Sequence, residues 1–144
     1  MSEGLYGAVK FLSTTNSRLY HFAKEHDIPN PVKSEDYHTT FIYSRKSVPI
    51  KTLGKLPDPV EIKHSTFEWD LFGPSKNILV IKFESMFLHY RWKYAMDRGA
   101  SYDFPEYIPH VTLSYDAEGF DHSKLPLPKF DLYIGEEYTK PLED

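Results

Sequence analysis

The chain has 144 residues, with 17 Lys and Arg against 21 Asp and Glu, giving a formal net charge of −4 and an isoelectric point of about 6.0. This length suits a single domain. The acidic balance disfavours a protein that wraps a long nucleic acid, because that activity needs a basic face. The absence of cysteine excludes disulfides, cysteine-ligated zinc and thiol nucleophiles. No apolar run approaches the roughly 20 residues of a membrane-spanning helix.

The first half of the chain is predicted to form a strand, a helix and two further strands, at Leu5–Leu12, Ser17–His26, His38–Ser44 and Val60–Leu71. The segment Ser13–Asn16 offers candidate N-caps for the helix, and Pro29 follows its end. The proline-bearing stretch Val48–Pro59 is predicted to be a loop.

The second half repeats this order, with predicted elements at Asn77–Phe83, Met86–Arg98, His110–Tyr115 and Phe130–Tyr138. The second of these is a helix, capped by Ser85 and ended by Gly99. A second loop is predicted at Leu125–Lys129, which carries two prolines.

The two halves are similar when the sequence is shifted by 72 residues. His38–Tyr43 then falls on His110–Tyr115, and Val9–Phe11 falls on Ile81–Phe83. We therefore expect an α+β fold in one domain, made of two pseudo-twofold-related βαββ halves at about residues 5–72 and 77–144. Their antiparallel sheets are expected to form a central cleft.

Both halves carry the string His-x-Thr on a predicted strand. Residues i and i+2 of a strand point to the same face, roughly 6–7 Å apart. His38 and Thr40 therefore share a face, as do His110 and Thr112. A pseudo-twofold axis would bring the two pairs together around one small polar site.

Two imidazoles and two hydroxyls suit the cleavage of a phosphodiester that has a neighbouring 2′-hydroxyl. One imidazole removes the proton from the hydroxyl and the other protonates the leaving oxygen, since the pKa of histidine lies near neutrality. Threonine hydroxyls stabilise charge on the phosphate oxygens. The scheme needs no metal and no cofactor.

One further histidine and two tyrosines next to the motifs are interpreted as structural. His64 belongs to a third His-x-Thr string, but no strand–helix unit precedes it at the matching distance. Tyr43 and Tyr115 stand an odd number of residues from the histidine and threonine of their strands, which predicts that they face the other way.

The duplicated motif resembles that of the two-histidine (2H) phosphoesterase superfamily, whose members have a bilobal α+β fold. Within it, three strings are similar to the family of phage anti-CBASS phosphodiesterases, which destroy the cyclic oligonucleotide signals of the bacterial host. The strings are Ile28–Val32, His38–Lys46 and Tyr102–Asp116. The resemblance covers about residues 5–140.

The resemblance implies a role for each matching residue. His38 and His110 are the acid and base pair, and Thr40 and Thr112 bind the phosphate. The resemblance further implies base contacts, by stacking on an aromatic ring and by an acidic residue of the last strand that reads adenine. The candidates for these contacts are Tyr6, Trp69, Glu136 and Glu137. The choice between Glu136 and Glu137 stays open, as does which histidine acts first as the base.

The expected activity is metal-independent hydrolysis of 3′–5′ cyclic di- and trinucleotides, such as 3′,3′-cGAMP, in the cytoplasm of an infected bacterium. The expected partner is the cyclic nucleotide alone, with no long nucleic acid, membrane or obligate protein partner. Two alternatives stay open. One is a 2H enzyme that acts on 2′,3′-cyclic phosphates or tRNA ends, and the other is a sponge that binds cyclic nucleotides without cutting them.

Overall fold

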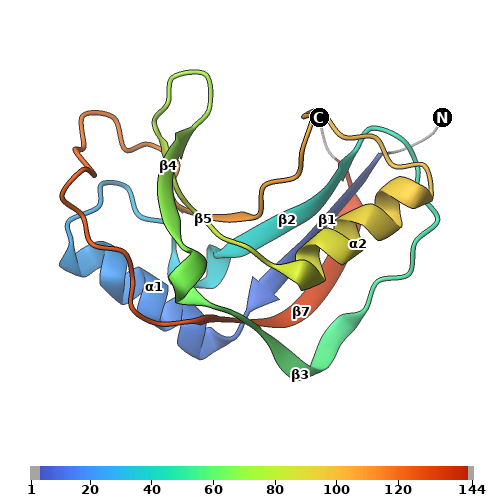
Figure 1. Cartoon of the computed structure of the whole chain (residues 1–144), viewed down its shortest axis with the longest axis horizontal. Helices are drawn as coiled ribbons and strands as arrows, with labels where there is room; N and C mark the ends of the chain where they lie inside the picture. Colours follow the sequence, from blue (N-terminus) through green and yellow to red (C-terminus); the bar gives the residue numbers. More distant parts are fainter. Residues whose placement is uncertain (1–3, 143–144) are drawn as a thin grey trace.

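The computed structural model describes residues 4–142 and contains two antiparallel sheets and two α-helices (Figure 1). The strands are β1 (Leu5–Phe11), β2 (His38–Ser44), β3 (Gly54–Ile62), β4 (Glu68–Phe72), β5 (Ile78–Lys82), β6 (His110–Ser114) and β7 (Leu132–Pro141). The helices are α1 (Ser13–Glu25) and α2 (Met86–Asp97). The predicted α+β class is confirmed.

The two sheets exchange strands between the halves of the chain. A four-stranded sheet, sheet A, has the order β2-β1-β7-β3, and a three-stranded sheet, sheet B, has the order β4-β5-β6. The last strand, β7, therefore lies beside the first strand, whereas β4 from the first half pairs with β5. The last two residues of the predicted second half lie outside the described residues.

The prediction of one strand over Val60–Leu71 is wrong. A short 3₁₀ turn at His64–Thr66 separates β3 from β4, and the chain passes there from sheet A to sheet B. The carboxylate of Asp131 accepts hydrogen bonds from the backbone N–H and the imidazole of His64, which holds the turn. Strand β3 also includes residues 54–59 of the predicted loop.

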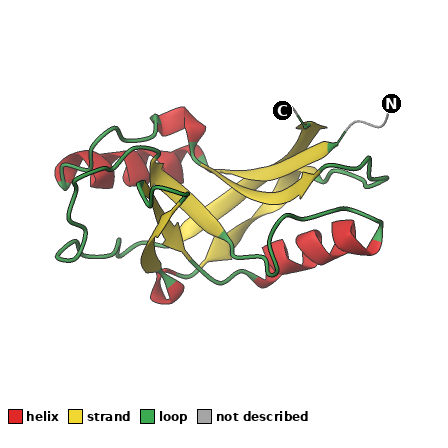
Figure 2. Cartoon of the chain, turned by 90° about the horizontal axis from the view of Figure 1, so that it is seen from above, coloured by secondary structure: helices red, strands yellow, loops and turns green. Residues whose placement is uncertain are grey.

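Each helix packs against a sheet that carries the histidine of the other half. The two helices lie toward opposite ends of the longest axis (Figures 1 and 2). Phe22 of α1 stacks on Trp69 of sheet B, with ring centroids 6.2 Å apart. Arg91 of α2 forms an ion pair with Glu137 of sheet A. Among residues 4–142, neither helix is long and apolar enough to cross a membrane.

Both ends of α2 follow the expected chemistry, since Gly99 comes directly after its C-cap Arg98 with a φ of 100°, but the start of α1 does not. The Ser85 hydroxyl accepts a hydrogen bond from the Leu88 N–H at 3.2 Å, so the predicted cap of α2 is confirmed. Helix α1 begins at Ser13, with Leu12 at the cap position and no side-chain cap. The prediction that Ser13–Asn16 would cap this helix is wrong, because these residues form its first turn.

Candidate active site

The two His-x-Thr motifs occupy equivalent positions in the two sheets. In sheet A, His38 lies opposite Lys10 of β1. In sheet B, His110 lies opposite Lys82 of β5. The alternation of side chains along a strand then places each histidine and the threonine two residues on at one face of its sheet. We call the faces that carry these residues the histidine faces.

The two imidazoles are held in the same way. Nδ1 of His38 lies 2.9 Å from the carbonyl oxygen of Asp36, and Nδ1 of His110 lies 2.9 Å from that of Ile108. A carbonyl oxygen only accepts, so Nδ1 donates its proton in both cases. The neutral ring then carries its lone pair on Nε2, which leaves Nε2 available to take a proton from a substrate.

Two hydrogen bonds cross between the histidine strands. The hydroxyl of Thr39 in β2 donates to the carbonyl oxygen of His110 at 2.8 Å. The hydroxyl of Tyr107, which precedes β6, donates to the carbonyl oxygen of Thr40 at 2.6 Å. Each motif is therefore fixed by a side chain from the other half, which sets the position of one imidazole relative to the other.

His110 lies in a more apolar setting than an exposed histidine. Its ring packs edge-on against Phe72, with the ring centroids 4.7 Å apart. Burial lowers the pKa of His110, and the nearby His38 lowers it further, against the opposing effect of the hydrogen bond to Ile108. His110 therefore favours the neutral form, which is the form required of a base.

The prediction that Tyr43 and Tyr115 face away from the motifs is wrong. The pairing register shifts between Gly7 and Ala8 opposite β2, and between Leu79 and Val80 opposite β6. Such a bulge inserts one residue and reverses the alternation beyond it. Tyr43 thus lies opposite Tyr6, and the centroids of the two rings are 6.4 Å apart.

Tyr115 helps to form a cavity beside His38. The cavity has a volume of about 390 Å³ and is lined by Lys10, Glu35, Asp36, Tyr37, His38, Tyr115 and Tyr138. Most of these residues belong to the first half or to β7, whereas Tyr115 reaches the cavity from the end of β6. The cavity is therefore built from both halves of the chain.

Tyr6 lies on the histidine face of sheet A and is hydrogen-bonded to the motif. Its hydroxyl is 2.8 Å from that of Thr40. Burial raises the pKa of Tyr6 to about 12, although the hydrogen bond to Thr40 opposes that rise. The phenol therefore stays neutral at physiological pH. The Lys140 ammonium lies 5.3 Å from the centre of the Tyr6 ring.

The structure separates the two glutamates of β7. Glu137 is fully buried, and its carboxylate accepts two hydrogen bonds from Arg91, both at 2.7 Å, and one from the Leu53 N–H at 3.0 Å. Glu136 lies opposite Lys10 in the register and is only partly buried. Glu136 therefore shares the histidine face, whereas the Glu137 carboxylate is occupied on the opposite face.

Trp69 lies away from the histidine face of sheet B. It pairs with Ile81, one residue out of phase with the pair of Lys82 and Glu68, and it packs on Phe22 of α1. Its indole N–H donates to the carbonyl oxygen of Leu125 at 3.2 Å. The aromatic side chain that contacts His110 is instead Phe72, which sequence reasoning missed because no motif marks it.

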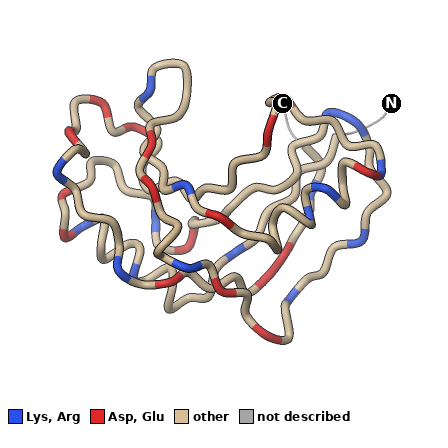
Figure 3. Tube along the Cα trace, viewed as in Figure 1, with Lys and Arg blue, Asp and Glu red and all other residues tan. Residues whose placement is uncertain are grey.

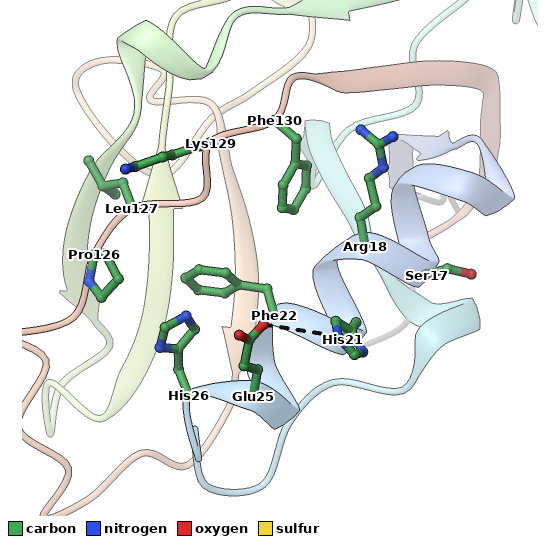
Figure 4. A pocket seen from close by; sticks show the side chains of 10 residues that line it. All are labelled: Ser17, Arg18, His21, Phe22, Glu25, His26, Pro126, Leu127, Lys129 and Phe130. Carbon is green, nitrogen blue, oxygen red and sulfur yellow. Dashed lines mark ion pairs between the residues drawn. The ribbon is translucent and has the colours of Figure 1, made fainter.

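A larger cavity of about 810 Å³ lies elsewhere, between α1 and the segment before β7 (Figure 4). It is lined by Ser17, Arg18, His21, Phe22, Glu25, His26, Pro126, Leu127, Lys129 and Phe130. Neither motif histidine borders it, and the imidazole of His21 is 4.0 Å from the Glu25 carboxylate. The smaller cavity is lined by His38 but not by His110, Thr40 or Thr112, so it lies beside one of the two motifs.

Comparison with known proteins shows the family to which the chain belongs. The family model of the anti-CBASS protein Acb1 matches residues 3–144. The Acb1 protein of Escherichia phage RB16 is 37% identical over 148 residues, covering 99% of this chain and 83% of that protein. That of Enterobacteria phage T4 is 34% identical over 143 residues, covering 99% of this chain and 90% of that protein.

Solved structures share the fold at low identity. The structure of E. coli LigT complexed with 3′-AMP has a TM-score of 0.63 at 14% identity, over 99% of this chain and 97% of that chain. A structure described as a phosphoesterase has a TM-score of 0.64, also at 14% identity, over 96% of this chain and 88% of that chain. With the fold of the 2H phosphoesterases and the match along almost its whole length, the chain belongs to the Acb1 family of phage anti-CBASS proteins.

Proposed function

We propose that this protein is a metal-independent phosphodiesterase that hydrolyses the 3′–5′ linkages of cyclic di- and trinucleotides, 3′,3′-cGAMP among them. Its role would be to remove the signals of the CBASS defence in the cytoplasm of an infected bacterium. Membership of the Acb1 family supports this role. The observation that carries the chemistry is the matched pair of His-x-Thr motifs, cross-linked by hydrogen bonds.

The first chemical step is an attack by the ribose 2′-oxygen on the adjacent phosphorus. Nε2 of neutral His110 takes the proton of the 2′-hydroxyl as the new P–O bond forms. Protonated His38 gives its Nε2 proton to the 5′-oxygen as the old P–O bond breaks. Thr40 and Thr112 donate hydrogen bonds to the non-bridging oxygens as charge develops there. The product is linear and ends in a 2′,3′-cyclic phosphate.

The second step returns both histidines to their starting forms. His38, now neutral, takes a proton from a water molecule that attacks the cyclic phosphate. His110, now protonated, gives its proton to the departing 2′-oxygen. No net proton is gained or lost by the protein, and no metal takes part. The assignment of His110 as the first base is supported by the burial that lowers its pKa.

Base contacts fall on the histidine face of sheet A. We assign Tyr6 to nucleobase contact and Glu136 to the recognition of adenine, since both lie on this face beside the motif. Glu137 and Trp69 are not assigned, because Arg91 occupies the first and Phe22 and Leu125 engage the second.

The decisive experiment is mass spectrometry of the products of 3′,3′-cGAMP with the wild type, His38→Ala and His110→Ala, each with and without EDTA. Removal of either imidazole is expected to lower kcat by about 10²–10⁴-fold, the usual contribution of general acid–base catalysis. EDTA is expected to leave the wild type unchanged.

Other outcomes would redirect the proposal. Loss of wild-type turnover in EDTA would contradict the mechanism. Recovery of unmodified ligand after long incubation would identify a sponge. Faster turnover of an oligonucleotide that ends in a 2′,3′-cyclic phosphate than of the cyclic dinucleotide would identify an RNA-end enzyme.

A further inference from the structure

Each motif histidine has a lysine directly opposite it on the neighbouring strand. Lys10 lies opposite His38, and Lys82 lies opposite His110. The two lysines are related by the same 72-residue shift as the two histidines. Partners in an antiparallel pair project to the same face about 5 Å apart, so each lysine stands beside its imidazole.

The charge of Lys82 is already compensated. Its ammonium lies 3.0 Å from the carboxylate of Asp70 and 3.6 Å from that of Glu68. The hydrogen bond to Asp70 raises the pKa of Lys82, against a smaller opposing effect of burial. A phosphate would therefore meet a group in which two carboxylates outnumber one ammonium.

Lys10 forms no such ion pair. Within residues 4–142, no carboxylate lies within ion-pair distance (4.0 Å) of its ammonium, although Glu136 is its register partner. The ammonium lies 5.1 Å from the centre of the Tyr138 ring, and Lys10 lines the 390 Å³ cavity together with His38 and Tyr115. The cavity beside His38 thus contains an ammonium that forms no ion pair among the described residues, although Glu35 and Asp36 also line this cavity.

The positive charge of Lys10 can interact with the second phosphate of the proposed substrate. A cyclic dinucleotide carries two phosphodiester charges, and only one phosphate can lie between the imidazoles. The protein has a net charge of −4, and acidic and basic positions are interspersed along its trace (Figure 3), so the chain as a whole does not attract a dianion. The second phosphate therefore needs a local cation.

We propose that Lys10 binds the non-reacting phosphate of the cyclic nucleotide, in an anion subsite bordered by the rings of Tyr115 and Tyr138. This inference rests on the proposed function and extends it. The subsite exists on the His38 side only, since Lys82 is already paired. A substrate with one phosphodiester fills the reacting position alone and gains nothing from Lys10.

The test compares Lys10→Met, which keeps most of the unbranched side chain and removes its charge, with Lys10→Arg, which keeps the charge. Lys24→Met on exposed α1 is the matched control. For 3′,3′-cGAMP, Lys10→Met is expected to raise KM about 10–100-fold, the range of a charge-assisted hydrogen bond. The value of kcat should be nearly unchanged, because a non-reacting phosphate is bound equally in the ground and transition states.

Two further readings separate this role from a general effect on folding. The KM of Lys10→Met should depend less on salt than that of the wild type, whereas Lys10→Arg and Lys24→Met should resemble the wild type. A mononucleoside 2′,3′-cyclic phosphate, which has only the reacting phosphate, should lose no affinity in Lys10→Met. If Lys10→Met has the same KM for 3′,3′-cGAMP as Lys24→Met, the proposal is overturned.

The experiment also distinguishes failure of the subsite from failure of the proposed function. If the wild type does not cleave 3′,3′-cGAMP, the proposed function is wrong. Calorimetry with inorganic pyrophosphate, which requires no hydrolysis, then still tests the subsite. Weaker binding to Lys10→Met than to Lys24→Met would support the anion subsite, and equal binding would contradict it.

Discussion

His38 and His110 have the same backbone contact but different surroundings. The ring of His110 is packed against Phe72 and is desolvated, and its pKa is lowered by that burial. A histidine whose pKa is lowered in the folded state stays neutral to a lower pH than usual. Activity that requires neutral His110 is therefore expected to persist below the ordinary histidine pKa of about 6.5.

Replacing Phe72 tests this dependence. Phe72→Ala admits water to His110, so the pKa should rise and the acidic limb of kcat/KM should move to higher pH. Phe72→Leu keeps an apolar group there and should leave the limb near its wild-type position. A pH–rate profile of the three proteins checks the shift, and an acidic limb that is identical in all three would contradict the role of Phe72.

A change of Glu to Gln is expected to lower the free energy of unfolding at one of the two neighbouring glutamates of β7 and to leave it unchanged at the other. Glu137→Gln removes one partner of a buried ion pair, and such changes cost about 3–5 kcal/mol of folding free energy. Glu136→Gln changes a partly buried group and should leave the free energy of unfolding near the wild-type value.

Denaturant unfolding and substrate selectivity together check this contrast. If Glu136 recognises adenine, Glu136→Gln should reduce the preference for adenine-containing cyclic dinucleotides over cyclic di-GMP. A destabilised Glu136→Gln beside an unaffected Glu137→Gln would reverse the assignment of the two faces.

At the scale of elements, strands β2 and β6 are joined by side chains that do not touch the substrate. Thr39 is a buried threonine whose hydroxyl donates to the carbonyl oxygen of His110. Valine has the same shape without the hydroxyl, so Thr39→Val leaves this carbonyl unpaired and the position of His110 less fixed. Small displacements of a catalytic group lower the rate sharply.

We therefore expect Thr39→Val to reduce kcat by about 10-fold or more, with little change in KM. Thr39→Ser, which restores the donor, should recover most of that loss. A purely structural role would lower stability without this difference in kcat between folded variants, so a Thr39→Val enzyme with wild-type kcat would contradict the positioning role.

Strand periodicity predicts the motif pairs but not the side chains that follow them. His38 and Thr40 share a face because the strand is regular between them. Beyond Thr40 a bulge reverses the alternation, and the same occurs after Thr112 in β6. Nothing in the local sequence marks these insertions, because they arise from the register with neighbouring strands. The faces of Tyr43 and Tyr115 were therefore predicted incorrectly.

For the whole molecule, the order of elements follows from the sequence, but the sheet to which each strand belongs does not. The segment 60–71 has the alternation of a single strand, yet the contact between His64 and Asp131 breaks it into two strands in different sheets. Asp131 is 67 residues away in the sequence. The burial of Glu137 likewise depends on Arg91, which lies on a distant helix. Such contacts are set by tertiary packing rather than by local propensity.

The exchange of β4 and β7 means that the backbone crosses between the lobes more than once. A cut in the exposed turn at Gly73–Lys76 would yield two fragments, each holding one motif and each lacking a strand that the other supplies. Their association would have to rebuild both sheets before the imidazoles could meet. The enzyme is thus suited to division into complementary fragments whose reunion is reported by cyclic nucleotide cleavage.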